Sequence, residues 1–173
     1  HTRFKCDWSS DVCSSDLYPS TNNFKELLVY KNHSKPRIGY FSSDFHDHAV
    51  MHLIMDVFRN QNHEAFDYYA FSFGPIINDP WSREVKKYFK RFFNINNKSN
   101  EDIISLGRSL ELDIAVDLKG YTVDCRTEIF SHRIAPIQIN YLGYPGTMGA
   151  NYMDYIIADE TIISKDSQKN FTE

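Results

Sequence analysis

Residues 133–149 read RIAPIQINYLGYPGTMG, and this stretch decides the fold prediction. The apolar run PIQINYL indicates a buried β-strand, and Gly143, Gly146 and Gly149 follow it. Glycines after a buried strand let the backbone turn sharply and bring N–H groups close to a ligand, typically an anion. The spacing differs from the G-x-G-x-x-G that opens a helix in dinucleotide-binding domains. The stretch therefore predicts a binding loop at one end of a sheet.

Strands alternate with helices over the rest of the chain. The strands are nearly continuous apolar runs, as expected when helices cover both faces of a parallel sheet. We therefore predict an α/β, Rossmann-like domain with a mainly parallel sheet flanked by helices. The expected strands are 37–42, 66–73, 91–95, 113–118, 136–142 and 155–158, and the expected helices are 49–59, 81–89, 100–110 and 125–132. We expect Ser99 to cap the 100–110 helix. The apolar stripe expected on the 49–59 helix consists of Val50, Leu53, Ile54, Val57 and Phe58.

The first residues differ in character from the domain. Residues 1–17 contain DWSSDVCSSDL, which resembles the translation of a sequencing-library adaptor and has no apolar periodicity. We interpret them as an artefact and exclude them from the fold prediction, with a natural serine-rich tail as the alternative. Residues 18–34 form a lead-in segment, and residues 35–173 form the domain. Because the chain stops after a strand-like DYIIAD and a polar run, we expect it to be truncated at its C-terminus.

Composition excludes several classes of partner. The formal net charge is −4, and the densest basic run, REVKKYFKR at 83–91, has the spacing of a solvated helix face, so we expect no nucleic-acid partner. No apolar run approaches the ~20 residues of a membrane span, so we expect no membrane contact. Without residues 1–17, Cys125 is the only cysteine, which favours a reducing, cytoplasmic compartment.

Three polar or glycine-rich loops follow strands that we expect to share one sheet edge, where ligands of such domains bind. The first loop contains Asp44, Asp47 and His48 directly before a helix. A helix start suits a phosphate, and a histidine beside a carboxylate is suited to proton transfer. Loop structure and N-capping are the alternatives for the two aspartates. The loops are 42–48, 118–123 and 142–149.

The second loop offers hydroxyl groups from Tyr121 and Thr122 and a permanently charged guanidinium from Arg126. The alternative is an ordinary strand-to-helix connection with Arg126 in a surface ion pair. His48 and His52 have a zinc-binding spacing on a helix, but the glutamate of H-E-x-x-H is replaced and no third ligand follows. We therefore expect no metal.

Three segments together, SSDFHDHAVMH, DLKGYT..CR.E and APIQ..YLGYPGT, resemble the catalytic region of the protein O-GlcNAc transferase family, which includes SPINDLY-like proteins. The resemblance spans residues 35–159, and the order and spacing of the segments make it specific. It implies the N-terminal half of a GT-B architecture, in which two Rossmann-like halves enclose the active site, usually after tetratricopeptide repeats. It also implies inverting transfer of N-acetylglucosamine from UDP-GlcNAc to serine or threonine hydroxyls of proteins, without a metal or other cofactor.

The resemblance assigns roles to residues of all three segments. Asp44 and His48 match the reacting centre, where they would position the substrates and move a proton. The residues that match the donor-binding loop are Leu142, Gly143, Tyr144 and Pro145. The residues that match the acceptor side are Asp47, Tyr121, Thr122 and Arg126.

Partners follow from the same resemblance: a sugar nucleotide, a protein acceptor and a C-terminal catalytic half that this sequence lacks. We expect the 173-residue chain to be inactive alone, because one half supplies neither the pocket nor the charge compensation for the diphosphate. Two alternatives stay open. One is a non-catalytic α/β protein-binding module, and the other keeps the fold but uses a different donor, such as GDP-fucose.

Overall fold

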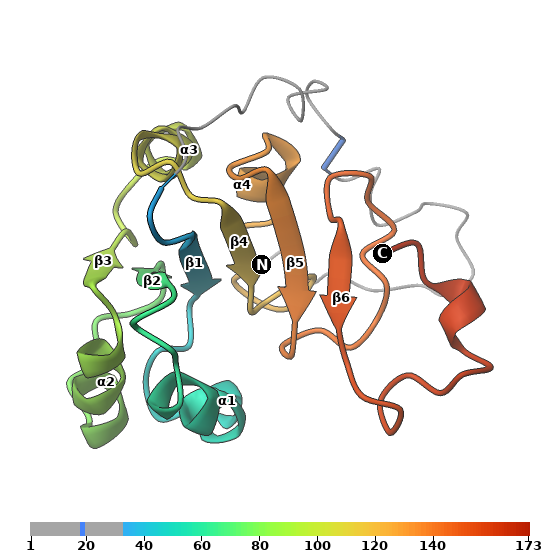
Figure 1. The fold of residues 1–173 in the computed structure, drawn as a ribbon, viewed down its shortest axis with the longest axis horizontal. Coiled ribbons are helices and arrows are strands. Elements are labelled where there is room, and N and C mark those ends of the chain that lie inside the picture. The colour runs from blue at the N-terminus through green and yellow to red at the C-terminus, as the bar shows by residue number, and fades with distance from the viewer. Residues whose placement is uncertain (1–17, 20–32) are drawn as a thin grey trace.

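A computed structural model describes residues 18–19 and 33–173. The adaptor-like residues 1–17 and most of the lead-in 18–34 lie outside the described residues. Within the described chain, six strands form one sheet in the order β3-β2-β1-β4-β5-β6, and every neighbouring pair is parallel (Figure 1). The predicted α/β fold with a parallel sheet is confirmed. The strands are β1 (Arg37–Ser42), β2 (Asp67–Ser72), β3 (Arg91–Asn94), β4 (Ile114–Asp117), β5 (Ile137–Tyr141) and β6 (Tyr155–Ile157).

The strand order places a topological switch point between β1 and β4. The chain builds outward from β1 to β3 and then returns to the other side of β1 to continue with β4. Loops leaving two strands at such a point diverge, which opens a crevice at their carboxyl ends. Two of the loops predicted to bind a ligand, 42–48 and 118–123, leave the sheet at this point.

Helices cover both faces of the sheet (Figure 1). They are α1 (Ala49–Arg59), α2 (Pro80–Val85), α3 (Asn100–Ser109) and α4 (Glu128–Ser131), with 3-10 turns at Lys86–Tyr88 and Gln168–Asn170. The side chain of Ser99 caps α3, accepting from the backbone N–H of Asp102 at 3.1 Å, as the sequence predicts. No helix in the described ranges is long and apolar enough to cross a bilayer.

Two predicted helices are shorter than expected. The 81–89 segment is helical only to Val85 and continues as a 3-10 turn, because Phe89 is already extended. Of the 125–132 segment only the four residues of α4 are helical, and the side chain of the preceding Thr127 does not cap this helix. The basic residues of 83–91 are all exposed, so that run is a solvated surface as predicted.

The apolar stripe of α1 is also shifted from the prediction. The sequence placed Leu53 and Val57 on the buried stripe, but their side chains are 67% and 42% exposed. Two methionines take their place in the core, since a methionine side chain fills irregular gaps between a helix and a sheet. The buried residues of α1 are Val50, Met51, Ile54, Met55 and Phe58.

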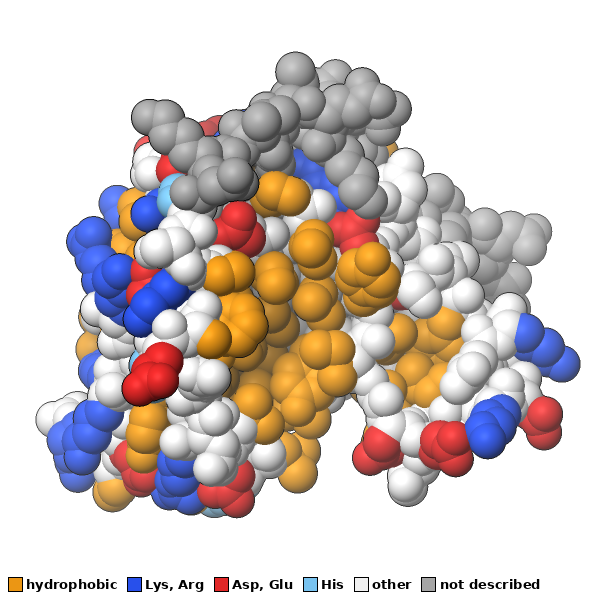
Figure 2. Space-filling view, viewed as in Figure 1, with side chains coloured by type: hydrophobic (Ala, Val, Ile, Leu, Met, Phe, Trp, Pro, Cys, Tyr) orange, Lys and Arg blue, Asp and Glu red, His pale blue; other side chains and the backbone are white. Residues whose placement is uncertain are grey.

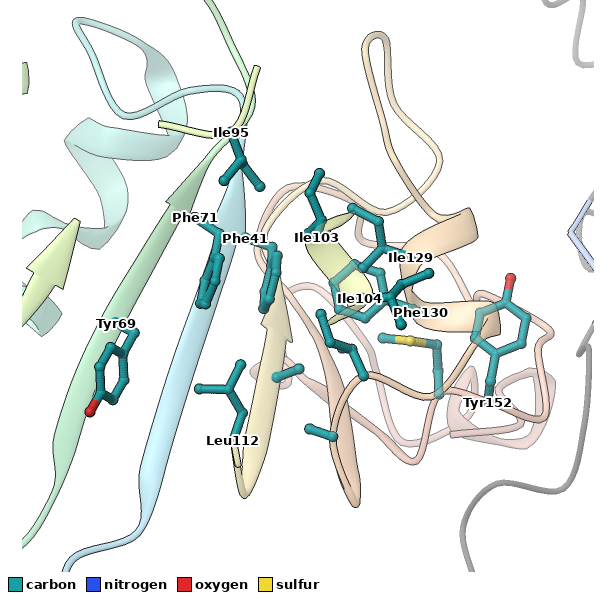
Figure 3. Close-up of a cluster of buried hydrophobic side chains, with 14 of the residues drawn as sticks. Phe41, Tyr69, Phe71, Ile95, Ile103, Ile104, Leu112, Ile129, Phe130 and Tyr152 are labelled. Carbon is teal, nitrogen blue, oxygen red and sulfur yellow. The ribbon is translucent and has the colours of Figure 1, made fainter. Parts of the chain in front are cut away.

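Each face of the sheet has its own hydrophobic core. Helix α1 packs over Tyr40 and Val116 on one face. On the other face α3 and α4 pack over Phe41 and Phe71, whose rings stack with centroids 4.3 Å apart (Figure 3). Side chains of β1 and β4 are packed into both cores. The carboxyl ends of these strands are therefore a rigid base for the loops that follow.

Candidate functional site

Asp44 and Lys119 form a buried ion pair at the switch point. Lys119 Nζ donates to Asp44 Oδ2 at 2.9 Å, and both side chains are more than nine-tenths buried. Asp44 Oδ1 accepts a further hydrogen bond from Ser43 Oγ at 2.7 Å. Removing one member of such a pair is costly because the other charge is left buried without compensation. The pair therefore joins the exit loops of β1 and β4 directly at the switch point.

Sequence reasoning missed Lys119. Its only local signal is its place between the β4 strand and Gly120, which any strand-to-helix connection could have. The ion pair joins residues 75 positions apart, so no periodicity could reveal it.

His48 is the N-cap of α1. Its Nδ1 accepts a hydrogen bond from the backbone N–H of Val50 at 3.2 Å. An imidazole nitrogen is therefore the capping acceptor, in place of the more usual oxygen of a Ser or Asp side chain. Capping of α1 by Asp44 or Asp47, the alternative that the sequence left open, is not what the structure shows. The ring lies 3.7 Å from Asp44 Oδ2, which is too far for a hydrogen bond, and its side chain is 40% exposed.

Asp47 faces away from the ion pair. Its Oδ1 lies 2.7 Å from His52 Nε2, and its backbone N–H donates to Asp79 Oδ2 at 2.7 Å. Asp79 in turn caps α2, and hydrogen bonds from the N–H groups of Ser82 and Asp47 help to hold its pKa below the ordinary value. His52 also lies over Trp81, with ring centroids 4.2 Å apart. Among the described residues, no three His, Cys, Asp or Glu side chains are arranged to hold a metal ion.

Asp117 and Asn140 bring two unsatisfied acceptors to the same edge. They are register partners on β4 and β5, are almost completely buried, and leave Asp117 Oδ2 and Asn140 Oδ1 without a hydrogen-bond donor. Burial raises the pKa of Asp117 to about 6, although its carboxylate accepts the backbone N–H of Lys119 at 2.9 Å. A buried carboxylate that lacks a donor favours its protonated form. Sequence reasoning missed both residues, because polar positions near the end of a strand look like ordinary sheet.

The predicted acceptor-side residues divide into two groups. Tyr121 packs edge-on against Tyr144, with centroids 5.7 Å apart, and its hydroxyl lies 3.4 Å from that of Tyr152. Thr122 donates to the carbonyl of Lys119 at 3.0 Å and so tightens the β4 exit loop. These residues lie on the loop beside the ion pair.

Arg126 is engaged with a different part of the chain. Its Nε donates to Asn100 Oδ1 at 2.8 Å, and its terminal nitrogens donate to the carbonyls of Lys98 and Ile95 at 2.9 and 3.3 Å. Burial lowers the pKa of its guanidinium, which stays cationic because the ordinary value is far above neutrality. The geometry makes Arg126 a tie between the loop before α3 and the segment before α4.

The 142–149 loop is packed more tightly than the sequence suggested. A Cβ on Gly143 would stand 1.9 Å from the carbonyl oxygen of Leu118, and a Cβ on Gly120 would meet Tyr144 Cβ at 2.4 Å. Leu142 adopts a φ of 73°, which is uncommon for a residue with a side chain. The glycines therefore serve close packing of two exit loops rather than open access, and the Gly143 N–H is bonded to the Tyr141 carbonyl at 2.9 Å.

The side chains of Asn140 and Glu173 fix the position of this loop. Asn140 Nδ2 donates to the carbonyl of Tyr144 at 3.0 Å. The Glu173 carboxylate accepts from Thr147 Oγ1 at 2.6 Å and from the backbone N–H of Met148. Pro145 is exposed at the tip. The Leu142–Pro145 stretch is thus a fixed surface beside the ion pair, as a binding loop requires.

A family comparison matches the whole domain. The model of glycosyl transferase family 41 matches residues 15–173, which includes the lead-in 18–34. The chain belongs to this family. The resemblance noted in the sequence to O-GlcNAc transferases, including SPINDLY-like proteins, is confirmed.

Named relatives of this family 41 chain are peptide N-acetylglucosaminyltransferases. It is 36% identical over 126 residues to the probable UDP-N-acetylglucosamine–peptide N-acetylglucosaminyltransferase SEC of Arabidopsis thaliana, covering 73% of this chain and 13% of SEC. It is 32% identical over 148 residues to the Caenorhabditis elegans enzyme of the same name, covering 83% and 12%. The chain therefore spans about an eighth of the length of these relatives.

A solved structure supports the fold. A mutant of the Thermobaculum terrenum O-GlcNAc transferase superposes with a TM-score of 0.76 at 27% identity, over 82% of this chain and 27% of that one. The expected Rossmann-like half of a GT-B fold is thereby confirmed.

Proposed function

We propose that this family 41 domain is the N-terminal half of the catalytic region of a protein glycosyltransferase that uses UDP-GlcNAc. The observation that carries the proposal is the buried Asp44–Lys119 pair, beside the half-exposed His48, at the switch point of the sheet. Open α/β sheets bind ligands at this point. The printed names of SEC and the C. elegans relative specify a UDP-N-acetylglucosamine donor and a peptide acceptor.

In the proposed reaction the oxygen of a serine or threonine attacks the anomeric carbon of N-acetylglucosamine. The new C–O bond forms as the bond from that carbon to the diphosphate oxygen breaks, UDP leaves with the bonding electrons, and the hydroxyl proton goes to a base. Asp44 and His48 would lie at the reacting centre without a metal or other cofactor. Leu142, Gly143, Tyr144 and Pro145 would contact the donor.

The acceptor protein would approach the exit loop of β4. Tyr121 and Thr122 lie there, and Asp47 and Arg126 would border the same side. Since Arg126 already binds Asn100 and two carbonyls, its contribution would be to shape the loop. A second Rossmann-like half would supply the remaining contacts to the nucleotide, so the 173-residue chain alone would be inactive. Cys125 is a free thiol, in keeping with a cytoplasmic location.

The test is glycosyl transfer by the full-length protein that contains this domain. The protein is incubated with UDP-GlcNAc or with GDP-fucose and a serine-rich acceptor peptide, and products are identified by mass spectrometry. We expect addition of N-acetylglucosamine. Addition of fucose would replace the donor assignment, and binding of the peptide without transfer from either donor would favour a protein-binding module.

Two histidine variants link the activity to the site. We expect His48→Ala to lower kcat by about 10²–10³-fold, as loss of one polar group at a reacting centre does. His63→Ala is the matched control, because His63 precedes β2 and so lies at the amino-terminal ends of the strands, opposite to the loops of the site. Equal activity of the two variants would remove His48 from the site.

A further inference from the structure

The two ring nitrogens of His48 have different surroundings. Nδ1 accepts the backbone N–H of Val50 at 3.2 Å, as the cap of α1. A nitrogen that accepts a hydrogen bond carries no proton, so the neutral ring bears its proton on Nε2. With Nδ1 committed to the helix and the side chain 40% exposed, Nε2 is the nitrogen left for a ligand.

Asp44 lies beside this ring, and its carboxylate is paired with Lys119. Asp44 Oδ2 lies 2.9 Å from Lys119 Nζ but 3.7 Å from His48 Nδ1. The other titratable group near the ring is His46 from the same loop, with centroids 5.8 Å apart. The partner of Asp44 thus comes from the exit loop of β4, and the His48 ring donates no hydrogen bond to the Asp44 carboxylate.

We propose that Lys119 is a positioning residue that, by pairing with Asp44, keeps the proton of the neutral His48 ring on Nε2, so that the ring presents a hydrogen-bond donor to the ligand. The proposal rests on the function proposed above and refines it. Its ligand atom is an oxygen that accepts a hydrogen bond, either on the diphosphate or on the sugar. His48 then holds the ligand and does not take the proton of the attacking hydroxyl.

Without Lys119, a stronger hydrogen bond competes for Nδ1. A hydrogen bond to a charged carboxylate is roughly twice as strong as one between neutral groups. Asp44, freed from the lysine, would accept a hydrogen bond from a protonated Nδ1 after a small movement of the ring, and the Val50 N–H would lose its capping acceptor. The ring would then carry its proton on Nδ1, and Nε2 would become an acceptor.

Nitrogen NMR of the ¹⁵N-histidine-labelled chain reads the tautomer directly. The measurement is made at about pH 8.5, above the ordinary histidine pKa of ~6.5, so that the ring is neutral. The His48 signal is assigned as the one missing from His48→Gln. We expect the wild-type ring to show a protonated Nε2 and an unprotonated Nδ1. A protonated Nδ1, or equal populations of both forms, would overturn the proposal.

Substitutions of Lys119 test whether this residue determines the tautomer of His48. In Lys119→Met we expect the Nδ1-protonated form to become the major one, while Lys119→Arg retains the wild-type tautomer because the positive charge remains. Backbone amide spectra establish that each variant is folded. An unchanged His48 tautomer in a folded Lys119→Met would mean that Lys119 does not position the ring. The wild-type measurement decides the tautomer even if that variant does not fold.

A matched pair of variants tests, in the full-length protein, whether Nε2 of His48 acts as a hydrogen-bond donor. His48→Gln places an amide N–H near the position of Nε2, whereas His48→Asn places its oxygen near Nδ1 and keeps the helix cap. We expect His48→Gln to retain at least tenfold more transfer activity than His48→Asn. An equal loss of transfer activity in both variants would indicate that His48 acts as the base that takes the hydroxyl proton. Failure of all transfer would refute the proposed function but not the tautomer, which the spectra of the chain decide separately.

Discussion

At the residue scale, Asp117 is a destabilising group at neutral pH. Its folded-state pKa is about 6, raised by burial from an ordinary value of 3.8. Between these values the folded state binds more protons than the unfolded state, so the free energy of unfolding falls as pH rises from about 4 to about 6. Two pKa units correspond to about 3 kcal/mol at most.

Asp117→Asn should remove this penalty. The amide keeps an oxygen for the Lys119 N–H and places a donor on the strand next to the unsatisfied oxygen of Asn140. We expect the free energy of unfolding at pH 7 to rise by about 1–3 kcal/mol and the gain to disappear near pH 4. Urea unfolding at both pH values measures it. Asp117→Ala is the control and should be less stable than wild type at both pH values, because it removes the acceptor of the Lys119 N–H. An effect of Asp117→Asn that does not depend on pH would contradict the titration of Asp117.

At the element scale, two exit loops are packed together through glycines. Gly120, with a φ of 54°, and Gly143 let the loops after β4 and β5 approach within contact distance of each other's backbone or Cβ atoms. Tyr144 lies between Gly120 and Gly146. Because the β4 loop also carries Lys119, movement of the 142–149 loop would be transmitted to the ion pair with Asp44.

Gly143→Ala should therefore disturb both loops. The new Cβ would stand 1.9 Å from a carbonyl oxygen of Leu118, and the backbone must move to relieve this. We expect a loss of more than ~2 kcal/mol in thermal unfolding, with faster amide exchange over 118–122 and 142–149. The control is Gly146→Ala, whose nearest neighbour is the far end of the Tyr144 ring, at 2.9 Å. It should cost under about 1 kcal/mol, and similar losses in both variants would show that the loop–loop contact is unimportant.

At the scale of the whole molecule, the two edges of the sheet differ. The β3 edge carries basic residues, with the Arg91 guanidinium 4.6 Å from the centre of the Phe93 ring. The β6 edge exposes Tyr155 and Ile157, at 57% and 48%. On the face that α1 covers, Ile137 of β5 is also exposed, and hydrophobic side chains gather over the middle of the molecule in Figure 2. An apolar edge strand is a site of association, while charges on an edge oppose it.

Ile157→Lys should reduce self-association of the isolated chain. A lysine on the open edge of β6 would oppose pairing with a second copy without removing a buried side chain. We expect light scattering to show less association and thermal unfolding to change by less than about 0.5 kcal/mol. Ile162→Lys is the control, since Ile162 is 58% exposed but lies outside the strands. An equal reduction by both variants would point to net charge instead of the edge.

Local pattern predicted much of this architecture. The alternation of strands and helices, the bounds of β1 and α1, the Ser99 cap and the three loops at one edge follow from periodicity and turn residues, which act over a few positions. The shortened α4 and the exposed Leu53 did not follow, because capping and the packing of a helix on a sheet depend on neighbours distant in sequence.

The sequence by itself determined the family, the α/β class and the edge at which polar side chains collect, because residue order and apolar period carry this information. Only the tertiary structure decided which of those side chains meet. Lys119 reaches Asp44 because the strand order places β4 directly beside β1, and that adjacency is a property of the whole sheet. The commitment of the Nδ1 of His48 to a helix N-terminus likewise depends on backbone geometry, which is formed only when α1 packs on the sheet.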